Sequence, residues 1–298
     1  MNKRKLIISL AVVLSMVWTM LLGFEAPVDA ASSSKYELPT SATMYAIKQD
    51  ENGNNIPGEW ELLAVEKFKY NKKGYITKET SAKDASSSPT STTTYKWKYK
   101  NGKPVKCTVK WSNGSSTALY KNGRLYKSTT KWKDSSGTRK NTETFKNNKQ
   151  GWLSSCYTPE FDAKAKFKYK YHSNGMPKKV TYTAGKTNYS SAKKFVSYHN
   201  KRGLRTKEVL KYGSVSYGTS KGVVDLKGGS NTNVYSYTYD SKGRVSSVTY
   251  KMVVDGKKSA FRRIVYGYGK KKVSNKRTYF AVMNREAYIA AVTADIRP

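Results

Sequence analysis

Polar and apolar residues alternate along much of the chain with the two-residue period of a β-strand. In Tyr95-Lys96-Trp97-Lys98-Tyr99 the aromatic rings fall on one face and the lysines on the other. Residues 107–111 and 167–171 show the same alternation. A helix would not keep such residues on opposite faces, so this period predicts strands with one apolar and one cationic face.

Glycines mark the ends of these strands at regular intervals. Asn-Gly pairs occur at 52–53, 101–102, 113–114, 122–123 and 174–175, and this dipeptide favours tight hairpin turns because it tolerates positive φ. Turn glycines in equivalent contexts are Gly74, Gly102, Gly123, Gly151, Gly175, Gly203 and Gly243. An aromatic strand precedes these glycines, and a strand with an apolar start follows most of them. The sequence therefore predicts an all-β fold, an antiparallel meander of repeated β-hairpins in a twisted or curled sheet.

The clearest repeat lies at residues 237–250, Tyr-Thr-Tyr-Asp-Ser-Lys-Gly-Arg-Val-Ser-Ser-Val-Thr-Tyr. It resembles the YD repeat of Rhs-like secreted bacterial proteins, in which Tyr-x-Tyr-Asp-x-x-Gly-Arg-[Leu/Val] recurs. The complete motif occurs once. In other repeats we place Asn71, Lys100, His172 or His199 at the position of Asp240, and the Gly-Arg pair recurs only at Arg124. The resemblance implies a long β-meander or a hollow shell, with links to carbohydrate binding or toxin carriage. No segment matches a toxin domain, so toxin carriage is not expected.

Both ends of the chain depart from the strand pattern. Residues 1–30 combine a basic start, an apolar run over 6–24 and small residues before Ala31, which predicts a cleaved signal peptide and a secreted protein. An uncleaved membrane anchor is the alternative, because 19 apolar positions approach the length of a membrane span. At the C-terminus, Asn284 as an N-cap and apolar residues at helical spacing predict a short helix over 284–298 that caps the sheet.

The charge is large, positive and unevenly placed. The chain has 56 Lys and Arg against 20 Asp and Glu, a formal net charge of +36. Acids and bases balance in residues 31–84, which we expect to form neutral N-terminal strands, so the excess lies in the basic hairpin repeat region, residues 85–283. Most of these cations are lysines, which are hydrated point charges without the fork of arginine. Such a field favours an anionic polymer over sequence-specific recognition of nucleic acid.

Candidate catalytic and metal-binding groups are scarce, and we predict no catalytic, cofactor or metal site. With two His and two Cys, a metalloenzyme built on these ligands is nearly excluded, and His172 and His199 are interpreted as polar residues beside turns. The carboxylate pairs Glu59 with Glu61 and Glu160 with Asp162 are interpreted as ordinary surface acids.

The two cysteines occupy equivalent repeat positions. Cys107 and Cys156 each follow a turn glycine by five residues and lie four strands apart in a simple meander. That separation is on the order of 19 Å at about 4.8 Å per strand. A disulfide needs much closer Cα atoms. We predict two unpaired thiols, although an oxidising exterior favours pairing.

The function suggested by these features is non-catalytic. We expect a secreted or cell-wall-associated repeat protein that contacts anionic or glycan polymers at the cell surface. Most of the aromatic face should be core. If part of it is open, the candidate polymer-binding residues are Trp97, Trp111, Trp132, Lys96, Lys98 and Lys110. The alternatives are a structural or adhesive repeat protein with a protein partner and, less favoured, a glycan-active enzyme; the sequence leaves the oligomeric state open.

Overall fold

The computed structural model describes residues 36–284 except 53, 160–162, 185–192, 213–214, 220–221, 227–228, 255–256, 270–274 and 276–277. The predicted signal peptide, residues 1–30, lies outside the described residues, as does the predicted C-terminal helix after Asn284.

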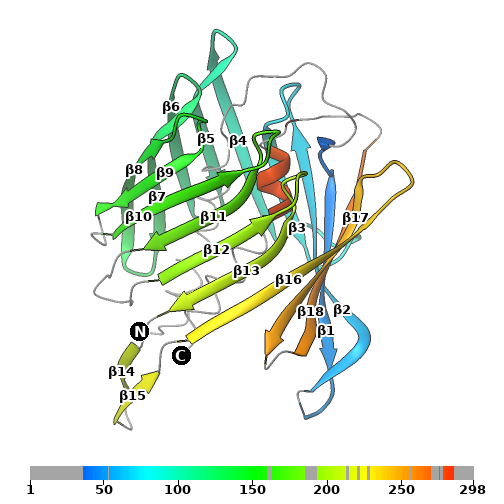
Figure 1. Cartoon of the computed structure of the whole chain (residues 1–298). Helices are drawn as coiled ribbons and strands as arrows, with labels where there is room; N and C mark the ends of the chain where they lie inside the picture. The colour runs from blue at the N-terminus through cyan, green and yellow to red at the C-terminus, as the bar shows by residue number, and fades with distance from the viewer. Residues whose placement is uncertain are drawn as a thin grey trace.

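The described strands form one closed antiparallel barrel of sixteen strands and a separate two-stranded hairpin, β14–β15 (Figure 1). The strands are β1 Ser41–Gln49, β2 Asn55–Tyr70, β3 Ile76–Ala82, β4 Ser91–Lys100, β5 Lys103–Trp111, β6 Gly114–Lys121, β7 Arg124–Asp134, β8 Gly137–Asn147, β9 Leu153–Thr158, β10 Ala163–Tyr171, β11 Pro177–Ala184, β12 Lys193–His199, β13 Arg205–Tyr212, β14 Val215–Thr219, β15 Gly222–Leu226, β16 Gly229–Tyr239, β17 Val245–Val254 and β18 Lys257–Gly267. The all-β, antiparallel prediction is confirmed.

The prediction of an open twisted or curled sheet is wrong, because the first and last barrel strands pair. β1 and β18 are antiparallel from Ser41 opposite Gly267 to Ala46 opposite Arg262. β1 also pairs with β2, so the ring is continuous. Closure gives the backbone groups of both edge strands partners and removes the edges that an open sheet would expose to other chains. The neutral strands β1–β3 therefore belong to the same barrel as the basic repeats.

All seven predicted turn glycines have positive φ, between 71° and 80°. They lie at one end of the barrel, here called the turn end, because successive antiparallel strands place alternate connections at the same end. At 101–102 and 122–123 both residues of the Asn-Gly pair have positive φ, as a two-residue hairpin turn requires. Asn113 and Gly114 differ: the hairpin there joins β5 and β6 at the opposite end, and Gly114 is the first residue of β6 with ordinary φ.

Five of the turns share one hydrogen-bond pattern. In the turn of the YD-like motif, the Asp240 N–H donates to the Arg244 carbonyl and the Gly243 N–H donates to the Asp240 carbonyl. The same two bonds occur in turns 71–75, 148–152, 172–176 and 200–204. The Asp240 carboxylate also accepts the N–H groups of Lys242 and Arg244. The side chain of the first residue caps its own turn in four of the five, those that begin at Asn71, Asn148, Asn200 and Asp240, which explains why Asp or Asn suits the position. In turn 172–176 the Met176 N–H donates to Asn174 Oδ1 instead.

A short helix of residues 278–284 lies inside the barrel at the turn end (Figure 1). The described helix begins at Thr278, six residues before the predicted start at Asn284. Asn275 is its N-cap, because the Asn275 side chain accepts the Thr278 N–H at 3.0 Å. Asn284, the predicted N-cap, is instead the last described residue of the helix. All seven helical residues are buried, so the helix fills the barrel interior and does not lie on an outer face.

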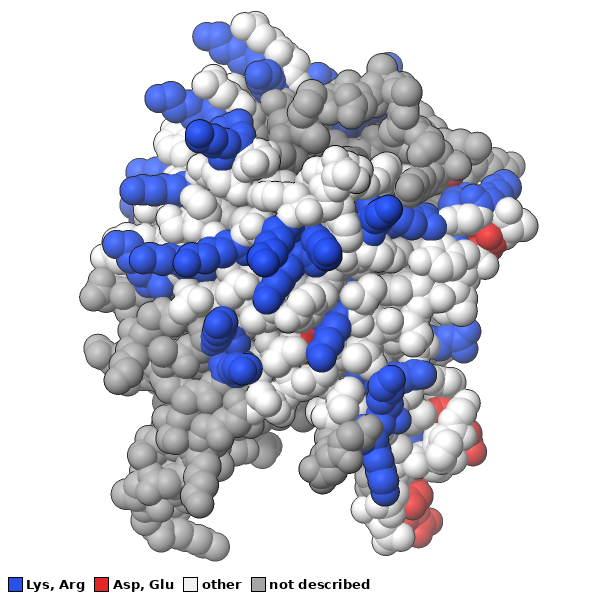
Figure 2. Space-filling model, viewed as in Figure 1, with Lys and Arg blue, Asp and Glu red and all other residues white. Residues whose placement is uncertain are grey.

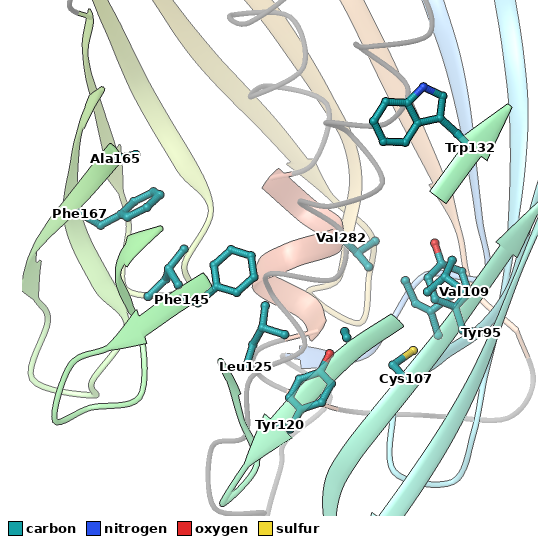
Figure 3. Packing of buried hydrophobic residues seen from close by; sticks show 13 residues of the cluster. Tyr95, Cys107, Val109, Tyr120, Leu125, Trp132, Phe145, Ala165, Phe167 and Val282 are labelled. Carbon is teal, nitrogen blue, oxygen red and sulfur yellow. The ribbon is translucent and has the colours of Figure 1, made fainter. Parts of the chain in front are cut away.

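The helix joins three hydrophobic clusters of the wall. Val282 packs among residues of β4–β10, including Leu125 and Phe145 (Figure 3). Tyr279 belongs to the cluster formed by β16–β18, β1 and β2, and Phe280 packs on Trp152 with ring centroids 5.2 Å apart. A sixteen-stranded barrel is too wide for side chains from opposite walls to meet at its centre. Residues of the helix bridge part of this gap.

Asn284 fixes the end of the helix to the wall. Its Oδ1 accepts the Arg205 N–H at 3.0 Å, and its Nδ2 donates to the carbonyls of Gly203 at 2.8 Å and Phe280 at 2.7 Å. The side chain is buried, so these backbone groups depend on Asn284 in place of water. This contact joins the helix to turn 200–204.

Candidate functional site

The outer wall formed by β4–β13 is the most distinctive surface of the molecule. Alternation turns the aromatic and aliphatic side chains inward and leaves the lysines outside. Lys96 and Lys98 on β4 and Lys110 on β5 are all exposed on this outer face, as the sequence predicts. Figure 2 shows that Lys and Arg are spread over the visible face of the barrel, whereas Asp and Glu gather mainly near the end of the β1–β2 hairpin.

Lysines on this wall stand directly opposite one another on neighbouring strands. The cross-strand pairs are Lys98 with Lys106, Lys131 with Lys140, Lys170 with Lys179, and Lys194 with Lys211. Like charges in such positions destabilise a sheet. The wall therefore carries an electrostatic cost.

Carboxylates do little to balance these charges. Among the described residues of β4–β13 the acids are Asp134, Glu143 and Glu208. Asp134 pairs with Arg139, whose Nε lies 2.8 Å from Asp134 Oδ2. Glu143 and Glu208 are buried. The described outer surface of these strands therefore has a positive field with little local compensation.

A hollow opens on this wall near the turn end. It has a volume of about 420 Å³ and is lined by Lys103, Lys121, Asn122, Arg124, Tyr126 and Asn147. A β-bulge shapes it: Leu119 pairs with Lys127 and Tyr120 with Leu125, so Tyr126 has no residue opposite it. Tyr126 is 43% exposed. Bulges commonly redirect a side chain in this way beside a binding site.

The three candidate tryptophans lie on the inner side of the wall. Trp97 packs on Tyr75 with ring centroids 4.6 Å apart, and its indole N–H donates to the Ile76 carbonyl at 2.8 Å. Trp111 and Trp132 both pair with Gly114, where a Cβ would approach the Trp111 ring to 2.5 Å. The structure thus brings Trp111 and Trp132 together and places Trp97 in another contact. None of the three shares a face with the candidate lysines.

Glu143 is the most unusual acid of the inner wall. It is 7% exposed, and Thr158 Oγ1 donates to its Oε1 at 3.1 Å. Its Oε2 is buried without a hydrogen-bond partner in the described structure. Burial raises the pKa of Glu143 to about 7 despite the bond from Thr158. A protonated carboxyl can also donate a hydrogen bond, so this group can exist uncharged in the core near neutral pH.

A second inner carboxylate, Glu208, has a partner for each of its two oxygens. Arg205 forms an ion pair with Glu208 Oε1, and the Tyr235 hydroxyl donates to Oε2 at 2.6 Å. Burial raises the pKa of Glu208 above its usual value even with Arg205 beside it. Because Arg205 is also the backbone partner of Asn284, this network supports the wall where the helix ends.

The histidines do not occupy equivalent positions. His172 begins turn 172–176, as expected, but Asn200, and not His199, begins the next such turn. His199 is buried with its ring centroid 5.0 Å from that of Phe280. Burial, followed by the charges of Arg205 and His172, holds the pKa of His199 well below its usual value. His199 thus lies directly before turn 200–204, beside a turn as predicted, but it is buried and does not share the position of His172.

The predicted thiol state is confirmed, because Cys107 on β5 and Cys156 on β9 are free. Burial raises both pKa values, that of Cys156 to about 12. Among the described residues no group of three or more His, Cys, Asp or Glu could hold a metal ion. Glu59 and Glu61 are exposed, and Glu59 pairs with Lys48; Glu160 and Asp162 lie outside the described residues.

Comparisons with known proteins give a likeness of fold only. No protein-family model matches the chain, and no curated protein matches it. A porin-like protein from Bacteroides uniformis is similar over 78% of this chain and 98% of its own, with 14% identity and a TM-score of 0.47. A porin-like protein from Bacteroides vulgatus is similar over 78% of this chain and 99% of its own, with 12% identity and a TM-score of 0.43. The match to the TcdB2-TccC3-Cdc42 structure spans 70% of this chain and 15% of the other, with 9% identity and a TM-score of 0.26.

The described helix is too short to cross a membrane.

Sequence reasoning found the lysines of the wall but missed the hollow. Arg124 was visible as the second Gly-Arg pair of the repeat, yet no pattern in the chain marks the bulge that exposes Tyr126. Lys103 is the first residue of β5, after one turn, and Asn147 is the last residue of β8, before another turn. Their proximity at the hollow therefore depends on the strand register.

Proposed function

We propose that the protein is a secreted, non-catalytic barrel that binds an anionic polymer of the cell surface along the lysine wall of β4–β13. The observation that carries the proposal is the opposition of lysines across neighbouring strands, at a cost to the fold, with few outer carboxylates beside them. A polyanion lying across the wall would neutralise several such pairs at once. The barrel presents these charges on a rigid surface, so little ordering accompanies binding.

Lysine chemistry determines the kind of binding. Ammonium groups are strongly hydrated and make few geometrically demanding contacts. We therefore expect affinity that depends on the charge density of the polymer more than on its monomer sequence. The inner tryptophans are not available as stacking platforms on this face, so the candidate residues for contact are Lys96, Lys98 and Lys110 together with the other wall lysines.

The test is retention on immobilised polymers at low salt, with polyphosphate and polygalacturonate as anionic probes and dextran as the neutral one. We expect retention on both anionic probes and none on dextran. The triple variant Lys96→Gln/Lys98→Gln/Lys110→Gln should weaken binding, because it removes three exposed charges of the wall.

A matched control removes the same charge elsewhere. Lys67, Lys257 and Lys258 are exposed on β2 and β18, outside the wall. The control Lys67→Gln/Lys257→Gln/Lys258→Gln has the same net charge as the wall variant. Equal weakening by both variants would show that only net charge matters and would contradict a binding wall. Retention on dextran, or none on either anionic polymer, would also refute the proposal.

The adhesive alternative makes a different prediction. A structural repeat protein would self-associate or bind a protein partner, and neither variant would change its behaviour on polyanions. Size-exclusion chromatography with light scattering measures this directly. Concentration-dependent assembly without polymer retention would favour the adhesive hypothesis over polymer binding.

A further inference from the structure

The hollow at the turn end differs from the rest of the lysine wall because three cations of two kinds converge on it. Lys103 comes from β5, Lys121 from β6 and Arg124 from β7. Lys121 and Arg124 are cross-strand partners on either side of the Asn122-Gly123 turn. The lining contains no carboxylate. Its volume, about 420 Å³, is within the range of ligand-binding clefts.

Arg124 gives the hollow directional chemistry that the lysines lack. Its Nη2 donates to the Lys149 carbonyl at 3.2 Å, which holds the guanidinium beside the neighbouring turn. A guanidinium has five N–H donors in a fixed plane, and such a fork binds two oxygens of a phosphate or a carboxylate. Arg124 is thus suited to orient one anionic group.

Tyr126 and Asn147 add features that suit a sugar or polyol. The bulge leaves the Tyr126 ring 43% exposed at the edge of the hollow. Aromatic rings with a polar tip bind apolar faces and hydroxyls together. Asn147 Nδ2 donates to the Leu125 carbonyl at 2.7 Å, whereas its Oδ1 is buried without a partner in the described structure. Asn147 is thus a polar lining residue whose amide oxygen is not matched within the described protein.

We propose that this hollow is a binding subsite for one phosphate of a phosphodiester-linked polyol or sugar chain, with the adjoining polyol or sugar unit against Tyr126. A carboxylate presents two oxygens in one plane, which Arg124 alone could satisfy. The two non-bridging oxygens of a phosphodiester lie on a tetrahedral centre and accept hydrogen bonds from several directions, as cations on three strands require. The inference rests on the proposed polymer binding and adds the ligand class and the residues that select it.

The experiment compares variants against a synthetic glycerol-phosphate oligomer, with polygalacturonate and a single-stranded DNA oligonucleotide as the other arms. Arg124→Lys keeps the charge and removes the fork; Tyr126→Ala removes the ring. We expect each to weaken binding of the glycerol-phosphate oligomer about tenfold, equal to about 1.4 kcal/mol. Lys67→Gln, on β2 and outside both the hollow and the lysine wall, is the control and should change this affinity less than about twofold. Thermal unfolding checks that each variant folds.

The outcomes separate the subsite from the wall. If Arg124→Lys and Tyr126→Ala bind like the wild type while the wall variant is weakened, the subsite is refuted and the proposed function stands. If the wild type binds none of the three polyanions, the proposed function fails as well. A larger effect of Arg124→Lys on polygalacturonate than on the glycerol-phosphate oligomer would overturn the assignment to a phosphodiester, and a larger effect on DNA would overturn a polyol or non-nucleotide sugar as the adjoining unit.

Discussion

Replacing Asn284 with alanine tests whether the inner helix is locked to the barrel wall. The substitution removes the acceptor of the Arg205 N–H and the donor to the Gly203 carbonyl, both at a buried position. Each buried backbone group left without a partner costs about 1–3 kcal/mol. We therefore expect the free energy of unfolding to fall by about 2–5 kcal/mol, at the upper end of single-residue effects.

Urea unfolding followed by tryptophan fluorescence measures this loss. The contact between Trp152 and Phe280 makes the emission sensitive to whether the helix is seated. The control is Asn113→Ala: Asn113 is exposed, and its Nδ2 reaches the Lys133 carbonyl only at 3.4 Å. It should cost less than about 0.5 kcal/mol. If Asn284→Ala were no more destabilising than Asn113→Ala, the helix would not be held by these bonds.

Three further predictions concern the barrel itself. The raised pKa of Glu143, about 7 in the folded state, means that the folded protein holds this proton more tightly than the unfolded chain, so stability should fall as pH rises from about 4.5 to 7. Glu143→Gln should abolish that loss and raise the free energy of unfolding at pH 8 by about 1–3 kcal/mol; an unchanged pH profile would contradict the burial of this carboxyl. Gly203→Ala should destabilise more than Gly175→Ala, since both have positive φ but only at Gly203 would a Cβ press on buried neighbours, the end of the Met176 side chain and the Phe280 ring; equal midpoints in thermal unfolding would show that this crowding is absent. Cys107, which is buried, should react with a thiol reagent only after unfolding, and Cys156, which is half-buried with a raised pKa, should react slowly in the native protein; the unfolded chain should give two thiols, and rapid labelling of the native protein would contradict this prediction.

Local features of the fold could be predicted because they depend on neighbouring residues. Positive φ at Gly102 and Gly123 follows from the Asn-Gly pairs, and the cationic outer face follows from the alternation around Trp97. Closure of the sheet could not be predicted, because it depends on β1 meeting β18 across the whole length of the chain. No local pattern distinguishes an edge strand from one that finds a distant partner.

The helix and the hollow show the same limit. Apolar spacing after Asn284 suggested where a helix starts, but the N-cap is Asn275, whose role is visible only through its bond to Thr278. The lysines of the hollow could be identified as exposed, but their convergence with Tyr126 depends on the bulge and on the register of four strands. Side-chain chemistry can be predicted from the sequence, whereas its assembly into a site requires the tertiary structure.

The affinity of the wild-type protein for polyphosphate, measured over a series of salt concentrations, tests the proposed function most directly. We expect affinity to fall steeply from about 0.02 to 0.5 M NaCl, since the Debye length shortens from about 20 Å to about 4 Å over that range. The wall variant Lys96→Gln/Lys98→Gln/Lys110→Gln should show a shallower dependence than the wild type because fewer charges contribute. Affinity that does not change with salt, or no binding at the lowest concentration, would contradict a role for the lysine wall.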